Sequence, residues 1–397
     1  MNRKERKKQK EQRDRKLAVD RYLSGEQVTT IAQSMGYSRQ WVHKWIQRHE
    51  GADDGTDWQQ SRSTNPESSP RQLTEEIVEA VKMMRLSLYN KGLFCGAQAI
   101  EWELKETGIE QVPSLRSINR ILSREELTHR RTGSYEPKGK KYPVLVANEV
   151  NQVHQTDYVG PCYLNGPVRF YSLNSVDLAT ARCAISPVLN KAGQNTVDAI
   201  WSSWCRLGIP NHQQVDNESV FFGSRQHPRG MGNLIRLCLL NEVQPWFIPM
   251  AEPWRNGVVE KFNDHYRCGF LKRVTMQGEE DLREQSLIFE QKHNSHYRYS
   301  KLRGQTPQRA LEQSRRTIRF PESVQSPKHP LPKPTTGRYH LVRFIRSSLL
   351  LDIFGEQFKM PSEATYEYVV ATIDVGKQTL SVGIDGRTIA EYEYQAR

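Results

Sequence analysis

Residues 152–159 read Gln-Val-His-Gln-Thr-Asp-Tyr-Val, and this stretch decides the prediction of the fold. Its apolar residues and short length are typical of a strand beside a core, but the stretch also contains Asp157. A carboxylate held beside a core costs stability unless a cation or a hydrogen-bond donor meets it. We therefore interpret Asp157 as a residue of a functional site.

Two more carboxylates stand in comparable positions. Asp216 ends a strand-like run at 212–216 and precedes Asn217 at the expected edge of a sheet. Glu260 lies in residues 255–263, which read Arg-Asn-Gly-Val-Val-Glu-Lys-Phe-Asn and are helix-like. Apolar residues at roughly helical spacing would pack this helix onto the sheet: Val259, Phe262, Tyr266 and Phe270. That packing directs Glu260 toward the edge where the strands end, so we expect the three carboxylates to meet there.

Carboxylates grouped in this way can bind magnesium, which prefers oxygen ligands in octahedral geometry. We expect two Mg²⁺ ions per site, with Mn²⁺ as an alternative. Asp157 would bridge the two ions, Asp216 would ligate one and Glu260 the other. Two such ions clamp the attacking and leaving oxygens of a phosphodiester during in-line displacement.

Three other acidic residues compete for these roles. Asp177 closes a predicted strand and is interpreted as a turn cap. Glu218 lies just past the second carboxylate and could orient metal-bound water. Asp264 is expected to pair with Lys261 or Arg267.

The charge of the chain points to a polyanionic partner. Its 397 residues carry a formal net charge of +12 and give a pI near 9.4. This length suggests roughly two to four domains. Residues 1–16 hold nine Lys or Arg against three Asp or Glu, which predicts a disordered basic tail that can lie on phosphates.

Residues 17–50 are predicted to form a helix-turn-helix domain, with helices at 17–23, 27–34 and 38–49. Gly36 and Tyr37 make the turn, and Ser38 caps the third helix. Val42, Trp45 and Ile46 would face inward. The outward residues, where a recognition helix meets DNA, are Arg39, Gln40, His43, Lys44 and Gln47. The alternative is a small helical bundle with a solvated basic face.

A linker rich in Gly, Ser, Asp, Asn and Pro is predicted at 51–72, and a second helix-turn-helix domain at 73–127. The outer face of its last helix, which Ser114 would cap, carries Arg116, Asn119 and Arg120 as DNA contacts. A basic connector follows at 128–148.

The pattern then changes to a central α/β domain at 149–275 with a mixed sheet flanked by helices. The predicted strands lie at 152–159, 168–176, 181–188, 212–216 and 246–249, and the helices at 195–207, 230–240 and 256–273. Residues 276–337 form a helical extension and linker. Strand signals return at 338–397, with a hairpin turn at Asp385 and Gly386, and predict a small all-β barrel. The chain is therefore predicted to be multidomain.

The cysteine spacing and the hydropathy of the sequence indicate where the protein acts. The six cysteines include no Cys-x-x-Cys pair, which argues against a disulfide scaffold and a zinc site. The sequence has no apolar run long enough to span a membrane, and no apolar stretch follows the basic N-terminus. We expect a cytoplasmic protein with no membrane partner.

With Asp157 after Gln-Thr, Asp216 between Val and Asn, and Glu260 in Asn-Gly-Val-Val-Glu-Lys-Phe-Asn, the chain resembles bacterial insertion-sequence transposases with a retroviral-integrase-type DDE core. The resemblance covers 150–275 well, and tandem helix-turn-helix units also fit such transposases. It implies an RNase H-like fold in which these three residues are the catalytic triad. It also implies a bacterial, nucleoid-associated protein.

Two features depart from this family. Glu260 follows Asp216 by 44 positions (260 − 216), which is longer than the usual spacing, and residues 223–232 account for the extra length. This loop could touch DNA or only lengthen the surface. The sequence also has no cysteine before Cys95, so it lacks the N-terminal His/Cys zinc module of retroviral integrases.

The expected reaction has two steps. Water first cuts at a transposon end and frees a 3′-hydroxyl, which then attacks a phosphodiester of target DNA. Basic residues after Glu260 would guide the DNA backbone: Lys261, Arg267, Lys272 and Arg273. Holding two ends together calls for a homo-oligomer on DNA. The alternatives are a domesticated DNA-binding regulator and a structure-specific nuclease without a joining step.

Overall fold

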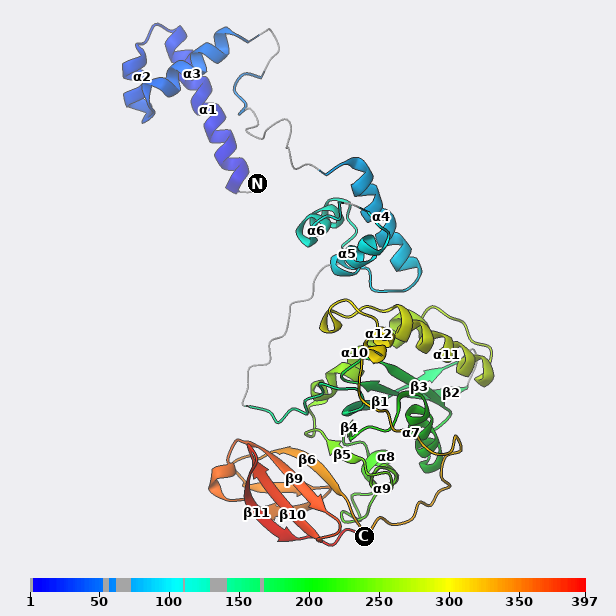
Figure 1. Ribbon diagram of the computed structural model, residues 1–397. Helices are drawn as coiled ribbons and strands as arrows, with labels where there is room; N and C mark the ends of the chain where they lie inside the picture. Colours follow the sequence, from blue (N-terminus) through cyan, green and yellow to red (C-terminus); the bar gives the residue numbers. More distant parts are fainter. Residues whose placement is uncertain (1–2, 53–56, 62–72, 110, 129–140, 165–167) are drawn as a thin grey trace. The chain divides into compact units, whose positions relative to one another are not determined.

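The computed structural model describes residues 3–52, 57–61, 73–109, 111–128, 141–164 and 168–397. The chain divides into two compact units, Met1–Gln72 and Leu73–Arg397 (Figure 1). No helix among the described residues is long and apolar enough to cross a membrane.

The first unit is a bundle of three helices, α1 (Arg3–Leu23), α2 (Val28–Met35) and α3 (Arg39–Glu50). Gly36 ends α2 in the left-handed conformation, with φ of 71°. Ser38 caps α3 by accepting a hydrogen bond from the Trp41 amide at 3.2 Å. The buried residues are Ala18, Val19, Ile31, Ala32, Val42, Trp45 and Ile46. The predicted helices, turn and cap are confirmed.

The disordered tail predicted at 1–16 is wrong for the described residues, because α1 already begins at Arg3. Tertiary contacts stabilise this helix. The Arg15 guanidinium donates to the Gln59 carbonyl at 2.7 Å and lies 4.2 Å above the Trp45 ring. These contacts also place residues 57–61 of the predicted linker against the bundle, whereas residues 1–2, 53–56 and 62–72 lie outside the described residues.

The second unit opens with three more helices, α4 (Glu75–Asn90), α5 (Ala97–Glu106) and α6 (Leu115–Arg124). Ser114 caps α6 by accepting from the Ser117 amide at 3.3 Å, as the sequence predicts. These helices enclose a separate core of Val78, Val81, Leu88, Ala99, Ile100, Leu104, Ile118, Ile121 and Leu122. Of the predicted connector, residues 129–140 lie outside the described residues.

These three helices pack on the rest of the second unit through contacts between aromatic rings. The Phe94 ring lies 4.6 Å from the His265 ring and 4.9 Å from the Tyr297 ring, between ring centroids. The Arg298 guanidinium, whose side chain is only 12% exposed, pairs with Glu103 at 2.9 Å. The predicted second helix-turn-helix is therefore attached to the helix that carries Glu260.

The central sheet has β1 (Val153–Tyr163), β2 (Arg169–Asp177) and β3 (Cys183–Val188) antiparallel, and β4 (His212–Val215) and β5 (Gln244–Phe247) parallel to β1. The order across this part is β5-β4-β1-β2-β3. The predicted mixed sheet is confirmed, with β1 extending beyond its predicted end because its Cys162 and Tyr163 still pair with β2.

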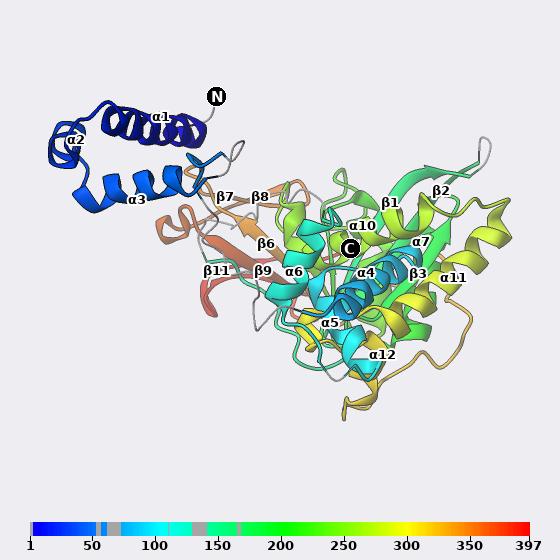
Figure 2. The ribbon, with the colours of Figure 1, turned by 90° about the horizontal axis from the view of Figure 1, so that it is seen from above.

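Helices cover both faces of this sheet (Figures 1 and 2). One core packs α7 (Gly193–Leu207), α8 (Ser219–Phe222) and α9 (Asn233–Leu240) on one face. The other core packs α10 (Gly257–Tyr266) and α11 (Glu279–His296) on the opposite face. Shorter helical segments are η1 (Pro253–Asn256), the π-helix η2 (Arg267–Leu271), η3 (Ser300–Leu302), α12 (Pro307–Glu312) and η4 (Ser362–Ala364).

The separate β-barrel predicted at 338–397 is not what these residues form. β6 (Arg338–Phe344) pairs with β5 in parallel, and β9 (Tyr368–Asp374), β10 (Thr379–Ile384) and β11 (Arg387–Glu393) follow it. The result is one sheet in the order β11-β10-β9-β6-β5-β4-β1-β2-β3. The outer edge of β5 offers unpaired backbone groups, and β6 satisfies them.

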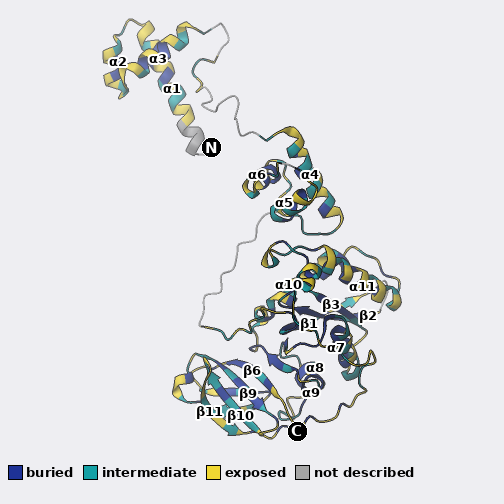
Figure 3. Cartoon of the chain, viewed as in Figure 1, coloured by how far each residue is buried: buried dark blue, intermediate teal, exposed yellow. Residues whose placement is uncertain are grey.

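Local features of this region follow the prediction more closely. The Asp385 and Gly386 turn is confirmed, with φ of 48° and 84°. A hairpin of β7 (Leu350–Ile353) and β8 (Glu356–Lys359) was not foreseen. Figure 3 shows that burial concentrates in the strands of the sheet and that exposed residues gather on helices and turns.

Candidate active site

Two amide side chains, Gln155 of β1 and Asn256 of η1, join the N-terminus of α10 to β1. Gln155 on β1 accepts hydrogen bonds from the backbone amides of Val258 and Val259 at 3.1 and 3.2 Å. Asn256 donates to the Thr156 carbonyl at 3.2 Å. These contacts hold the first turn of α10, which carries Glu260, against the strand that carries Asp157.

A chain of buried amides orients Asp157. Its Oδ2 accepts from Asn263 Nδ2 at 2.9 Å, and Asn263 Oδ1 accepts from Asn174 Nδ2 at 2.9 Å. Ser172 completes the chain by donating to Asn174 Oδ1 at 2.7 Å. The sequence analysis missed Asn174 and Asn263. Asn263 could have been found, because it lies three residues after Glu260 and such residues share a helix face.

Asp216 stands directly after β4, in a turn held by its neighbours. Its Oδ1 accepts from the Glu218 amide at 2.9 Å, and Asn217 donates to the Ile248 carbonyl at 2.6 Å. Glu218 pairs with Lys191, whose ammonium also lies 4.7 Å from the centre of the Tyr158 ring. Glu218 therefore has a cation of its own, and its predicted contact with metal-bound water stays a prediction.

Burial and mutual repulsion raise the pKa of all three carboxyl groups. Burial raises the pKa of Asp157 to about 7, with further contributions from Asp216 and Glu260. Burial also raises the pKa of Asp216, to which Glu218 adds, and that of Glu260, to which Asp264 and Asp216 add. The structure therefore brings the predicted triad within electrostatic reach of one another.

The triad has no cationic partner in direct contact and is not arranged as a finished metal site. Among the described residues, Asp157, Asp216 and Glu260 make no ion pair with a lysine, arginine or histidine within 4.0 Å. Within the same residues, no group of three His, Cys, Asp or Glu side chains stands close enough to hold a metal ion. A cation bound here would require the carboxylates to draw together.

The competing acids have other surroundings. Asp177 accepts from the amides of Asn151 and Thr180, each at 2.9 Å, which confirms it as a turn cap. Asp264 is exposed. Its predicted pairing with Lys261 or Arg267 is not found among the described ion pairs.

The predicted DNA contacts are all exposed but lie on three different helical segments. Arg39, Gln40, His43, Lys44 and Gln47 line α3, and Arg116, Asn119 and Arg120 line α6. The third set, on α10 and the segment after it, comprises Lys261, Arg267, Lys272 and Arg273. Arg273 also donates to the Tyr89 carbonyl at 3.4 Å, so it takes part in docking the α4–α6 helices.

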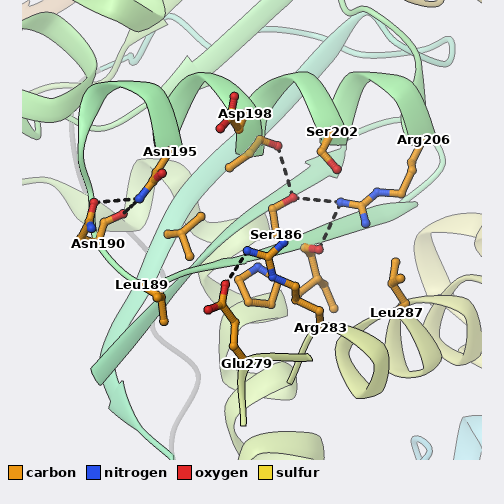
Figure 4. Close-up of a pocket in the computed structure, with 14 residues that line it drawn as sticks. Ser186, Leu189, Asn190, Asn195, Asp198, Ser202, Arg206, Glu279, Arg283 and Leu287 are labelled. Atoms are coloured by element: carbon orange, nitrogen blue, oxygen red, sulfur yellow. Dashed lines mark hydrogen bonds and ion pairs between the residues drawn. The ribbon is translucent and has the colours of Figure 1, made fainter. Parts of the chain in front are cut away.

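A cavity of about 420 Å³ lies apart from the triad, between β3, α7 and α11 (Figure 4). Its charged groups are paired internally. Arg206 donates to Ser186 Oγ at 2.9 Å, and Arg283 pairs with Glu279 at 2.5 Å. None of the triad residues lines it, so it is not part of the carboxylate site.

Comparison with known proteins identifies one domain. A family model described as a homeodomain-like domain matches residues 10–56, which cover α2, α3 and the later part of α1. No curated protein matches the chain.

Solved structures give weak likenesses. The catalytic core domain of the HTLV-2 integrase, in complex with magnesium, is 16% identical with a TM-score of 0.32, over 41% of this chain and 97% of that one. A chain of the simian T-cell lymphotropic virus intasome, in complex with the PP2A regulatory subunit B56 gamma, is 13% identical with a TM-score of 0.37, over 80% of this chain and 97% of that one.

Replacing Gln155 with leucine should destabilise the second unit by about 1–3 kcal/mol, because the buried Val259 amide at the start of α10 loses its acceptor. Urea unfolding would measure this loss. Gln291→Leu, at an exposed position of α11, is the matched control and should change stability little. Equal stability of both variants would contradict the anchoring of α10 by Gln155.

Proposed function

We propose that this protein is a DNA transposase of the DDE type, which binds transposon ends, cuts them to free a 3′-hydroxyl and joins that hydroxyl to target DNA. One observation carries the proposal: Asp157 inside β1, Asp216 directly after β4 and Glu260 on α10 lie within electrostatic reach of one another, with raised pKa values and no ion-pair partner among the described residues. Carboxylates arranged in this way are unfavourable by themselves and become favourable when cations bind.

The donor set fits magnesium. Carboxylate oxygens are the ligands that this ion prefers, and the described part of the site offers no thiolate or imidazole in their place. Asp157, Asp216 and Glu260 would hold the ions. When bound, the ions would supply charge neutralisation and polarise the phosphodiester.

The residues of the chain itself hold and orient the reacting groups. Asn263 orients Asp157, and Gln155 with Asn256 holds the helix that carries Glu260. Lys261, Arg267 and Lys272 are exposed on α10 and the segment after it, and would hold the DNA backbone by charge. Catalysis is then mainly positioning and charge neutralisation, without a covalent enzyme intermediate.

The same proposal also covers the fold, the recognition of DNA and the assembly of the protein. The strand order β3-β2-β1-β4-β5 supports the RNase H-like fold that the resemblance implies. The homeodomain-like domain and α6 would read the transposon end, and two ends held together require a homo-oligomer on DNA. Such an enzyme would act in the cytoplasm of a bacterium, on the nucleoid.

The test is Mg²⁺- or Mn²⁺-dependent cleavage and joining on duplexes from the ends of the host element, with wild type beside Asp157→Asn. Joined product that is lost in the variant supports the transposase. Cleavage without joining would replace it with a nuclease. Tight, sequence-specific binding without chemistry in either protein would replace it with a DNA-binding regulator.

Magnesium alone should stabilise the wild-type protein. A ligand that binds only the folded state adds about 2.7 kcal/mol at 100 times its Kd. A thermal melt with increasing Mg²⁺ should therefore show a rising Tm in wild type and a much smaller rise in Asp216→Asn. Asp385→Asn, in the exposed β10–β11 turn, is the matched control and should respond as wild type does. An identical rise in all three proteins would place the metal elsewhere.

A further inference from the structure

An arginine of the C-terminal strands reaches the turn that carries Asp216. Arg343 lies on β6 and is only 5% exposed. Its Nη2 donates to Asn217 Oδ1 at 2.9 Å, and its Nη1 donates to the Ile248 carbonyl at 3.3 Å. Asn217 donates to the same Ile248 carbonyl at 2.6 Å, which closes a three-membered network beside Asp216.

This guanidinium is buried and makes no ion pair within 4.0 Å with a carboxylate of the described residues, although the charge of Asp352 acts on it from farther away. Its remaining bonds go to backbone carbonyls, with Nε donating to Asp352 at 3.1 Å and Nη1 to Val342 at 2.9 Å. Burial lowers the pKa of Arg343 to about 10, so the group is still charged at neutral pH. A buried charge that is not directly paired costs stability, which its hydrogen bonds have to offset. The contact with Asn217 is what an apolar residue cannot supply.

The loop at 223–232, which lies between Asp216 and Glu260 in the sequence, also contacts the C-terminal segment. Arg229 pairs with Glu356 at 2.6 Å, and Tyr394 donates to the Pro228 carbonyl at 3.0 Å. The Met231 amide donates to the Arg397 carbonyl at 2.9 Å. The extra length between Asp216 and Glu260 therefore packs on the C-terminal strands, which are held against the Asp216 turn as part of the same body.

We propose that Arg343 is a positioning residue of the proposed active site: through Asn217 it sets the backbone turn that presents Asp216 to the metal. The C-terminal strands then contribute to metal binding by holding one ligand in place. This inference rests on the proposed function, since it assumes that Asp216 binds a cation. Residues that orient metal ligands typically change metal affinity or activity by about 10–100-fold when they are replaced.

The test measures the Mg²⁺ concentration that raises Tm by a fixed interval above its metal-free value, using the full chain and magnesium alone as the probe. Asn217→Ala and Arg343→Lys should each raise this concentration by about 10–100-fold, because lysine cannot reproduce the planar fork of arginine. Arg338→Lys is the matched control. It lies on the same strand, but its guanidinium pairs at the surface with Asp374 at 2.8 Å, so the concentration should stay at the wild-type value.

The double variant Asn217→Ala with Arg343→Lys separates positioning from general destabilisation. If the two residues act through one contact, the double variant should need no more Mg²⁺ than the worse single variant. Should Arg343→Lys fail to fold, Asn217→Ala alone decides, because it leaves the carbonyl contacts of Arg343 intact.

The outcomes distinguish this inference from the proposed function. A cooperative melt with a wild-type Mg²⁺ requirement in Asn217→Ala overturns the role of Arg343 while the metal site stands. Multiplying effects in the double variant overturn it as well. No Mg²⁺ response in the wild-type protein overturns the metal site and this inference together.

Discussion

Asp157→Asn is expected to abolish DNA cleavage and joining, with a loss on the order of 10⁴-fold, as when an essential catalytic group is removed. Asparagine keeps the size of the side chain and its contact with Asn263, but it removes the charge that would bridge two cations. A gel assay on end duplexes with Mg²⁺ measures the loss. Wild-type activity in the variant would remove Asp157 from the site.

The same variant should bind end DNA as well as the wild type does. The predicted reading surfaces lie on α3 and α6, and Asp157 belongs to neither. Without metal, the variant should also melt at a higher temperature, because burial and the charges of Asp216 and Glu260 disfavour an ionised Asp157. Asp385→Asn is again the control and should retain activity and the wild-type Tm. Loss of DNA binding or a lower Tm in Asp157→Asn would point to misfolding.

Ending the chain after residue 337 is expected to abolish cooperative folding of the second unit. The removed strands share one hydrophobic core with α7, α9 and β5, to which they contribute Tyr339, Leu341, Val369, Ala371, Ile373, Leu380 and Val382. Each large apolar side chain buried there is worth about 1.5–3 kcal/mol, whereas a whole domain is stable by only about 5–15 kcal/mol. Near-ultraviolet circular dichroism and a thermal melt would show the loss of fixed packing.

Removal of residues 1–72 is the contrasting deletion. These residues form a compact unit with its own core, so residues 73–397 should fold and melt cooperatively without them. A cooperative melt of residues 73–337 would show that the C-terminal strands form an independent domain, as the sequence alone suggests. That result would also remove the structural basis for the role of Arg343.

The local elements could be predicted because their signals lie within a few residues. The spacing of Val42, Trp45 and Ile46 predicted the buried face of α3, and Ser38 predicted its start. Asp385 and Gly386 predicted a hairpin for a similar reason, since both adopt positive φ. Asp157 stood out because a carboxylate held beside a core is costly unless a cation or a hydrogen-bond donor meets it.

Contacts between distant segments could not be predicted from these local signals. The strand character of 338–344 was visible, but nothing in its own sequence says that it pairs with β5. The basic composition of 1–16 predicts disorder. In the folded unit, however, these residues belong to α1, which is stabilised by the contacts of Arg15 with the Trp45 ring and the Gln59 carbonyl. Asn174 lies 89 positions from the Asn263 that it orients.

By itself, the sequence determined most of the helices and strands, the faces they bury, and the three carboxylates: one inside a strand, one directly after a strand and one on a helix. The tertiary structure decided that the C-terminal strands extend the central sheet, and that Arg343 and Asn217 connect them to Asp216. The physical reason is one of range. Backbone preference and hydrophobic period act over a few residues, whereas pairing of a strand edge and burial of a charge depend on which distant partner folding brings to them.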